Sequence, residues 1–406
     1  MITDQLMREA QTAIRRGEMP LAEALLRQIR AIDPQNLWAL NTLGEVLAEQ
    51  GMIEAADEAL GESLLRQPDD PQTLANRAAL LYRLNREEGI ALARRSIALR
   101  PGDARTHMIL AEALLRRGEY EAGWAEYEWR LRMPGYEQFG RTNLSQPRWD
   151  GGDLAGRTIL IHAEQGLGDM ILMMRYVPLL AGRGARVMVE CEAPLRSLIA
   201  GVEGVAEVIA RGTPLPAFDV HCPVMSLPRA FGTTLATVPA DVPYIRCQDE
   251  PSGDPLSVGI AWSGGPRAVR RKCPPDVFAR LMQIPGVRWI SLQMPGAHVD
   301  PLTPPAGASF IDPTAQLRDF ADTATLVAAL DLIITVDTVV AHLAGAMGKP
   351  VWTLLTYAAD WRWLRDRTDS PWYPTTRLFR QKSRGDWENV ASDASNALID
   401  QLGLER

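Results

Sequence analysis

Hydrophobic residues in the first 135 positions recur at helical spacing, and the helices that they predict recur with a longer period. Three features return every 33 or 34 residues: a proline, a small residue within a helix, and a Gly or Asn at a turn. This period predicts helix pairs that stack into a solenoid, each pair joined at the turn residue and closed by the proline. The prolines are Pro34, Pro68, Pro101 and Pro134, the small residues are Ala10, Gly44, Ala78 and Ala111, and the turn residues are Gly17, Gly51, Asn85 and Gly118.

From Arg157 onward the pattern changes to short apolar runs separated by helical segments, and this pattern restarts near residue 257. It predicts two consecutive Rossmann-like halves, with a ligand cleft beyond the carboxyl ends of their strands. The expected strands are 158–163, 186–191, 205–209, 219–222, 257–262, 287–293, 332–336 and 351–355, and the expected helices are 169–181, 193–200, 275–283, 321–329, 338–347 and 389–402.

Pro- and Gly-rich stretches mark the expected domain boundaries. A connector at 136–156 follows the repeats of 1–135, and Trp149 within it is expected to dock on a neighbouring domain. The first half is expected at 157–248 and the second at 255–385, with a linker of turn-forming residues between them. We expect the last segment, 386–406, to be a helix that crosses back and braces the first half.

Composition excludes several classes of protein. Hydrophobic content of 46% and charged content of 23% are ordinary for a globular domain, and a net charge of −7 argues against a nucleic-acid-binding surface. The four cysteines form no C-x-x-C pair, which indicates reduced thiols. No apolar run approaches the roughly 20 residues of a membrane span, and no basic segment followed by an apolar core begins the chain. These features predict a cytoplasmic protein.

The first candidate site is the turn Glu164-Gln165-Gly166-Leu167-Gly168-Asp169, which joins an expected strand to an expected helix. Gly166 and Gly168 allow close backbone approach to a ligand, and the helix start offers N–H groups. The turn is not a dinucleotide fingerprint, because Ile171 stands where the third glycine would be. Asp169 distinguishes it from a plain turn.

The second candidate site is the turn Trp262-Ser263-Gly264-Gly265-Pro266, which four cations follow within six residues. Backbone donors at Ser263 and Gly264 together with cationic side chains suit a diphosphate. The alternative is a solvated basic loop. The cations are Arg267, Arg270, Arg271 and Lys272.

The third candidate site lies where the strand 332–336 runs into a helix. Thr338 is expected to cap that helix, so that free N–H groups there hold a phosphate. Asp337 can accept hydrogen bonds from sugar hydroxyls, and His342 lies one helical turn further along the same face. The alternative is an ordinary capped helix with a core histidine.

Aromatic residues cluster in the last repeat and after the last expected strand. We favour core packing for the first cluster and loop anchoring for the second, over the stacking of a ligand. The first cluster is Tyr120, Trp124, Tyr127 and Trp129, and the second comprises 360–364 and 371–374.

The residues also carry a resemblance. The repeats resemble the tetratricopeptide repeat (TPR), with Leu40 in place of its signature tryptophan. The stretches 162–169, 259–266 and 336–352 resemble heptosyltransferase-type glycosyltransferases, glycosyltransferase family 9, of the GT-B class. Repeats followed by such a module are similar to bacterial TPR-glycosyltransferases that modify proteins, including flagellin, and to O-GlcNAc transferase. The resemblance covers about residues 1–135 and 155–400.

This resemblance implies a fold class of α + α/β, a TPR α-solenoid followed by a GT-B pair of Rossmann-like domains. It implies that Asp169 is the general base toward an acceptor hydroxyl, with Glu164 and His162 as alternatives. His221 would line the acceptor side, although a core histidine is the favoured interpretation. The donor-binding residues that the resemblance implies are Arg271, Asp337, Thr338 and His342, to which the second turn adds Ser263, Gly264 and Lys272 as residues suited to a diphosphate. The family's Asn is replaced by Gly265, and Lys272 stands where Ser is common.

The expected function is sugar transfer from a nucleotide-activated donor to a protein hydroxyl of Ser or Thr, with inversion. The repeats would recruit the acceptor, for which flagellin is a candidate by family analogy alone. No cofactor or metal is expected, since the sequence has no D-x-D motif. The alternatives are a non-catalytic TPR adaptor with a degenerate GT-B module, and a sugar transferase that acts on lipopolysaccharide.

Overall fold

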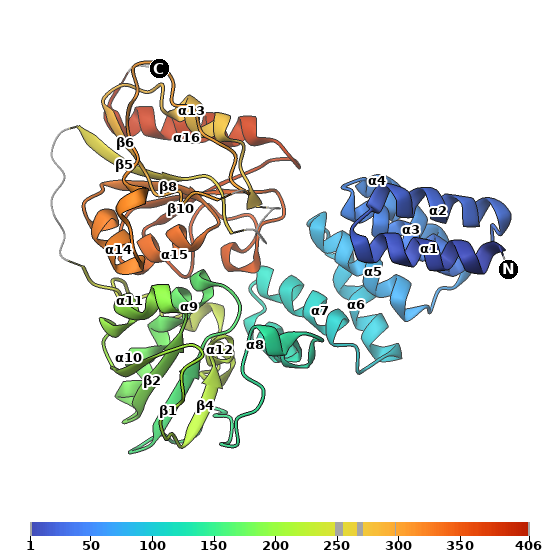
Figure 1. Cartoon of the computed structure of the whole chain (residues 1–406), viewed down its shortest axis with the longest axis horizontal. Helices are drawn as coiled ribbons and strands as arrows, with labels where there is room; N and C mark the ends of the chain where they lie inside the picture. The colour runs from blue at the N-terminus through green and yellow to red at the C-terminus, as the bar shows by residue number, and fades with distance from the viewer. Residues whose placement is uncertain (1, 248–254, 266–270, 297, 405–406) are drawn as a thin grey trace. The chain divides into compact units, whose positions relative to one another are not determined.

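The computed structural model describes residues 2–247, 255–265, 271–296 and 298–404. Its contacts divide the chain into two units, Met1–Leu115 with Ala125–Met133, and Arg116–Trp124 with Pro134–Arg406. Figure 1 shows helical pairs in the N-terminal part of the chain and two parallel sheets with covering helices in the rest. The predicted fold class, helical repeats followed by a pair of Rossmann-like sheets, is confirmed.

Eight helices make up the repeats, and all four predicted turn residues join them. Gly17, Gly51, Asn85 and Gly118 have φ values of 75°, 81°, 59° and 82°, a left-handed conformation that Gly and Asn adopt most readily. This shared conformation explains why the period is visible in the sequence. The helices are α1 (Ile2–Arg16), α2 (Met19–Ile32), α3 (Leu37–Glu49), α4 (Ile53–Arg66), α5 (Pro71–Arg83), α6 (Glu88–Leu99), α7 (Ala104–Arg116) and α8 (Tyr120–Tyr127).

The small-residue series marks the positions where helices approach closely. A Cβ atom on Gly44 would lie 2.6 Å from Cγ of Leu60 on the paired helix. Ala10, Ala78 and Ala111 are fully buried. Larger side chains at these positions would force the helix pairs apart.

The first sheet of the second unit is parallel, with the strand order β3-β2-β1-β4. The strands are β1 (Thr158–His162), β2 (Arg186–Cys191), β3 (Val205–Ala210) and β4 (Val220–Pro223). The helices of this part are α9 (Leu167–Met173), α10 (Val177–Gly182), α11 (Arg196–Ala200) and α12 (Leu227–Ala230). The predicted strands are all present, and the predicted helix 169–181 is divided by a 3₁₀ turn at Met174–Tyr176.

The second sheet is also parallel, with the order β10-β9-β8-β5-β6-β7. Its strands are β5 (Leu256–Ala261), β6 (Val287–Ser291), β7 (Ser309–Ile311), β8 (Leu332–Val336), β9 (Val351–Leu355) and β10 (Thr376–Arg380). Its helices are α13 (Pro275–Leu281), α14 (Phe320–Ala328), α15 (Val339–Ala346) and α16 (Trp387–Leu402). The two edge strands, β7 and β10, were not predicted from the sequence.

The predicted role of the C-terminal helix is wrong. Instead of bracing the first sheet, α16 packs beside α13 on the second (Figure 1). Its buried face, which includes Val390, Ala394 and Leu398, joins the core around Phe278 and Leu281. The apolar face of α16 is therefore buried against the second sheet domain.

The connector docks on the first sheet, as predicted for Trp149. The Trp149 side chain is buried, and its backbone N–H donates to the His221 carbonyl at 2.8 Å. Arg141 forms a bidentate ion pair with the buried Glu190 on β2. The predicted linker at 249–255 lies almost wholly outside the described residues. No helix in the described part of the chain has the length and apolarity that a membrane crossing requires.

Two members of the first predicted aromatic cluster, Tyr120 and Trp124, pack against the second cluster in the core of the second unit. Trp124 packs edge-on against Trp361 at a centroid distance of 5.0 Å, and Tyr120 stacks on Trp372 at 5.8 Å. The phenol of Tyr120 also accepts a hydrogen bond from Nε1 of Trp372 at 3.1 Å. These contacts confirm core packing as the role of Tyr120 and Trp124.

Candidate active site

The starts of α9 and α15 are in direct contact, and this contact brings the carboxyl ends of β1 and β8 together. A Cβ atom on Gly168 would lie only 2.7 Å from Cδ2 of His342. Only glycine permits this approach without displacement of the imidazole. The first and third candidate sites predicted from the sequence therefore form one site.

Five charged side chains of alternating sign form a continuous row at this junction, which we call the charge row: Asp169, Arg362, Asp360, Arg271 and Asp337. Asp169 comes from α9, Asp337 follows β8, and Asp360 and Arg362 follow β9. Arg362 contacts Asp169 and lies 2.5 Å from Asp360. Arg271 lies 3.1 Å from Asp360 and 3.2 Å from Asp337.

Asp169 is held from two directions. Its Oδ2 accepts the backbone N–H of Gly166 at 2.8 Å, which fixes the carboxylate at the mouth of its own turn. Its Oδ1 pairs with the Arg362 guanidinium. The Asp169 side chain is 14% exposed, so an approaching hydroxyl can reach a carboxylate whose orientation is already set.

Asp337 and His342 form the buried end of the site. Burial raises the pKa of the Asp337 carboxyl, and the charge of Arg271 opposes that rise. Oδ2 of Asp337 lies 3.2 Å from Nη1 of Arg271, and its Oδ1 lies 4.0 Å from Nε2 of His342. Burial and the charges of Arg362 and Arg271 hold the pKa of His342 well below its usual value. His342 is therefore neutral at physiological pH.

His342 is fixed on its other side by aromatic residues. Its Nδ1 lies 3.0 Å from the Tyr373 hydroxyl, and its ring stacks on Trp363 at a centroid distance of 5.5 Å. Tyr373 and Trp363 are themselves fully buried. The imidazole has no room to move away from Gly168.

Asp360 connects the two arginines of the charge row. Burial alone would raise the pKa of Asp360, but the charges of Arg362 and Arg271 outweigh it and hold the pKa at about 2. The backbone N–H of Arg362 also donates to Asp360 Oδ1 at 3.1 Å. Asp360 remains a carboxylate at every physiological pH.

Thr338 caps α15 as predicted, since its side chain accepts the Val340 N–H at 3.2 Å. The N–H groups of Ala341 and His342 bond to the Thr338 carbonyl at 3.1 and 3.4 Å. This helix start therefore has fewer unpaired donors for a phosphate than the sequence analysis expected.

The two described cations that follow the second predicted turn, Arg271 and Lys272, have different partners. Arg271 joins the charge row, whereas Lys272 pairs with Asp300 at 2.6 Å. The Ser263 N–H donates to Gln293 at 2.8 Å, and His298 Nε2 lies 3.0 Å from the Gly264 carbonyl oxygen. The predicted residues Pro266, Arg267 and Arg270 lie outside the described residues.

The alternative base Glu164 is 1% exposed, and both of its oxygens accept hydrogen bonds. Tyr136 of the connector donates one and the Met225 N–H donates the other, each at 2.9 Å. These contacts fit a structural role in joining the connector to the first sheet.

The two histidines named with Glu164 form a pair, with Nε2 of His162 3.1 Å from Nδ1 of His221. His162 is completely buried, and burial with the charge of Arg148 lowers the pKa of His221. These positions fit the core interpretation that the sequence favoured for His221.

Arg362, Asp360 and Tyr373 were not predicted as site residues from the sequence. All three lie in the two aromatic segments, 360–364 and 371–374, for which loop anchoring was the favoured interpretation. A usable signal was present, because Asp360 and Arg362 alternate with tryptophans shortly after the buried strand that ends at Leu355. Charged residues in such an apolar context are rarely placed there without a partner.

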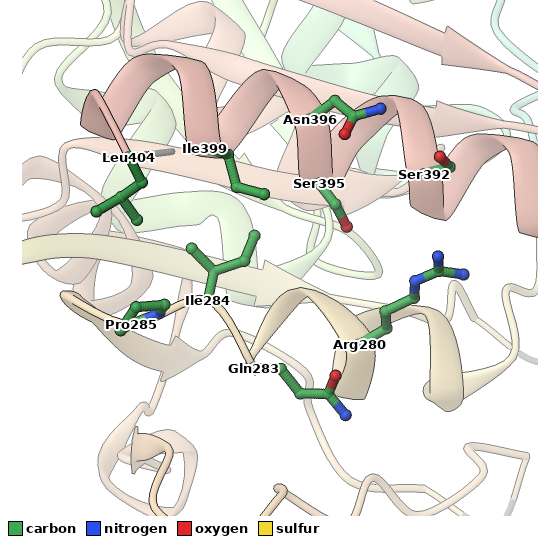
Figure 2. A pocket seen from close by; sticks show the side chains of 9 residues that line it. All are labelled: Arg280, Gln283, Ile284, Pro285, Ser392, Ser395, Asn396, Ile399 and Leu404. Atoms are coloured by element: carbon green, nitrogen blue, oxygen red, sulfur yellow. The ribbon is translucent and has the colours of Figure 1, made fainter. Parts of the chain in front are cut away.

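A separate pocket of about 470 Å³ lies between α13 and α16 (Figure 2). Figure 2 shows Arg280 and Gln283 on the α13 side, and Ser395 and Asn396 on the α16 side. None of the predicted site residues lines this pocket. It is distinct from the charge row.

Sequence comparison places known families on both parts of the chain. Residues 13–80 match the tetratricopeptide repeat, and residues 316–385 match glycosyltransferase family 9 (heptosyltransferase). The chain is thus similar to the tetratricopeptide repeat in its N-terminal part and to glycosyltransferase family 9 over residues 316–385. Protein FlbA of Caulobacter vibrioides is 28% identical over an alignment that covers 93% of this chain and 69% of FlbA.

Solved structures with similar parts include a mutant O-GlcNAc transferase of Thermobaculum terrenum and a family 9 glycosyl transferase of Veillonella parvula. The first is 15% identical with a TM-score of 0.37, covering 99% of this chain and 91% of its own. The second is 11% identical with a TM-score of 0.42, covering 63% of this chain and 92% of its own.

The glycosyltransferase family 9 match contains one side of the candidate site. Asp337, Thr338 and His342 lie within residues 316–385, and so do Asp360 and Arg362. Asp169 and Arg271 lie outside that range. The charge row therefore joins residues of the matched segment to residues contributed by the rest of the second unit.

Proposed function

We propose that this protein transfers a sugar from a nucleotide-activated donor to a hydroxyl of a protein acceptor. The observation that supports this most strongly is the charge row, which links a carboxylate at a turn of the first sheet to the helix start of the second. The ends of parallel strands are the usual ligand site of such sheets.

In the proposed reaction Asp169 accepts the proton of the acceptor hydroxyl. The hydroxyl oxygen forms a bond to the anomeric carbon of the sugar, on the face opposite the leaving group. The bond from that carbon to the diphosphate oxygen breaks, and the nucleoside diphosphate leaves with the electron pair. The anomeric configuration inverts, and Asp169 ends the step protonated.

The residues of the second sheet fit the donor. Arg271 is the cation of the charge row nearest Asp337, and a guanidinium is well suited to a diphosphate. The two buried oxygens of Asp337 can accept hydrogen bonds from sugar or ribose hydroxyls. With cations and a helix start near the leaving group, we propose a reaction without a metal ion or other cofactor.

The repeats fit a role in holding the acceptor, because tetratricopeptide repeats stack into extended surfaces suited to protein segments. The acceptor would then present a Ser or Thr hydroxyl to Asp169. Flagellin is one acceptor to test.

A donor panel tests the proposal. Full-length protein is mixed with UDP-, GDP-, ADP- and CMP-linked sugars at millimolar concentration, and the thermal midpoint is measured. A donor that binds the folded state raises the midpoint by mass action. If no donor shifts it, glycosyl transfer is refuted, and a non-catalytic adaptor becomes the better explanation.

Transfer itself is measured as a gain of one sugar in the intact mass of a co-expressed acceptor. We expect Asp169→Asn to retain the donor-induced shift and to lose about 10²–10⁴-fold in transfer rate. Asp276→Asn is the matched control, because Asp276 is an exposed carboxylate in the first turn of α13. Equal transfer by the two variants would exclude Asp169 as the base.

A further inference from the structure

We propose that Arg362 is a positioning residue for Asp169, and that Asp360 couples it to the donor-binding cation Arg271. This inference rests on the proposed function. It assigns a role to the D-W-R-W segment that follows β9, which sequence reasoning treated as a loop anchor.

Arg362 is built into the site rather than resting on its surface. Its side chain is 6% exposed. One terminal nitrogen contacts Asp169 on α9, and the other lies 2.5 Å from Asp360 in the same short turn. A guanidinium can make both contacts at once because its donors are spread over a rigid plane.

The guanidinium is also fixed by its own segment. Its central carbon lies 4.2 Å from the centroid of the Trp361 ring, a cation–π contact. Trp361 is 1% exposed and packs against Trp124 and Trp372. Arg362 therefore presents a donor to Asp169 from a rigid aromatic base.

Asp169 depends on this donor for its orientation. Its own turn contributes one contact, the hydrogen bond from the Gly166 N–H to Oδ2. That hydrogen bond alone does not fix the position of Oδ1. Arg362 holds Oδ1 from the second sheet. The carboxylate is thus aligned only when both sheets contribute a donor, and misalignment of a reacting group by about 1 Å can cost about 10²-fold in rate.

Asp360 links Arg362 to Arg271, the cation that we propose binds the donor. Its Oδ1 contacts Arg362 and its Oδ2 contacts Arg271. A diphosphate that draws Arg271 away from Asp360 leaves that carboxylate with Arg362 as its remaining cation. Donor binding is in this way transmitted to the group that aligns Asp169.

The test compares Arg362→Gln with Arg271→Gln in full-length protein. We expect Arg362→Gln to lower kcat about 10²-fold with donor Kd within about threefold of wild type. We expect Arg271→Gln to raise donor Kd about tenfold or more. Arg367→Gln is the matched control, because Arg367 pairs with Asp369 in an exposed ion pair of the same segment, and it should match wild type in both measurements.

Two further variants separate positioning from a merely structural role. Added guanidinium ion should raise the kcat of Arg362→Ala by about tenfold or more, whereas ammonium ion should raise it less. Arg362→Lys should keep donor binding yet remain at least tenfold slower, since one ammonium group cannot replace the two-sided contact. If the Gln and Ala variants fail to fold, Arg362→Lys decides the question by the same kcat and Kd criteria.

The outcomes separate the inference from the proposed function. If the wild-type protein neither binds a donor nor transfers sugar, the proposed function fails and the inference fails with it. If the wild type transfers sugar but Arg362→Lys and Arg362→Gln keep wild-type kcat, the inference alone is overturned. An unchanged kcat with a raised donor Kd in the Arg362 variants would also overturn it, because that result makes Arg362 a donor ligand.

Discussion

Gly168→Ala would test whether the close approach of α9 and α15 is necessary for activity. The added methyl carbon would lie 2.7 Å from Cδ2 of His342, whereas carbon atoms normally pack at about 3.5–4.0 Å. Roughly 1 Å of space must therefore open. His342 cannot supply it, because the Tyr373 hydroxyl lies 3.0 Å from its Nδ1 and Trp363 stacks on its ring.

Two effects on stability oppose each other in this variant. Crowding a packed site costs about 1–3 kcal/mol, while replacing a helical Gly by Ala contributes up to about 1 kcal/mol. We therefore expect a net loss of about 0–3 kcal/mol in the free energy of unfolding. The effect on transfer should be larger, about 10²-fold, because the displaced helix carries Asp169.

The assay is the transfer rate together with the thermal midpoint, and Gly182→Ala is the control. Gly182 ends α10, and nothing lies within 4 Å of a Cβ atom placed there. That variant should match wild type in transfer and should not be less stable. If Gly168→Ala also keeps transfer within about threefold of wild type, the contact between the two helix starts does not position the base.

Three further predictions concern other parts of the chain. In Glu164→Gln the new amide NH₂ group faces either the Tyr136 hydroxyl or the Met225 N–H, both of which donate to Glu164. The free energy of unfolding should therefore fall by about 1–3 kcal/mol, with transfer per folded molecule retained. Lost transfer at normal stability would make Glu164 a base. Gly51→Ala should lower the free energy of unfolding in urea by about 1–2 kcal/mol, because φ at this position is 81°. Gly51→Asn should lower it less, since Asn85 occupies the equivalent turn with a positive φ. Equal losses in the two variants would contradict this reasoning. The lowered pKa of His342 keeps its side chain neutral in the folded protein, whereas in the unfolded chain it binds a proton below about pH 6.5. The free energy of unfolding should therefore fall below that pH, by up to about 1.4 kcal/mol per pH unit. If His342→Asn loses stability with the same slope against pH, this reasoning is wrong.

The fold could be predicted wherever its signals are local. The repeats are visible in the sequence because each turn requires a residue that adopts a left-handed conformation. The strands β8 and β9 are fully buried runs, in each of which a single threonine is the only polar residue. The edge strand β7 has only three residues with no fully buried side chain, so no apolar pattern marks it. The pattern of α16 predicts a buried face but cannot say which surface covers it, and this explains the error in its placement.

The site could be predicted only in pieces. Asp169, Asp337 and Thr338 stand at strand-to-helix turns, a position that the sequence reveals. Arg271 and Lys272 are adjacent in the chain, yet one joins the charge row and the other turns to Asp300. No sequence pattern distinguishes the two directions. Arg362 could not be linked to Asp169, because pairing between distant segments follows from packing alone.

The distance along the chain between Asp169 and Arg362, 193 positions, affects how the protein is made. Ribosomes add about 5–20 residues per second, so Asp169 emerges about 10–40 seconds before its partner exists. The first sheet can fold within that interval, once residue 223 has been added, since all of its strands lie within residues 158–223. The base can be aligned only near the end of synthesis, and a nascent or truncated chain without β9 and the segment after it would carry an unaligned Asp169.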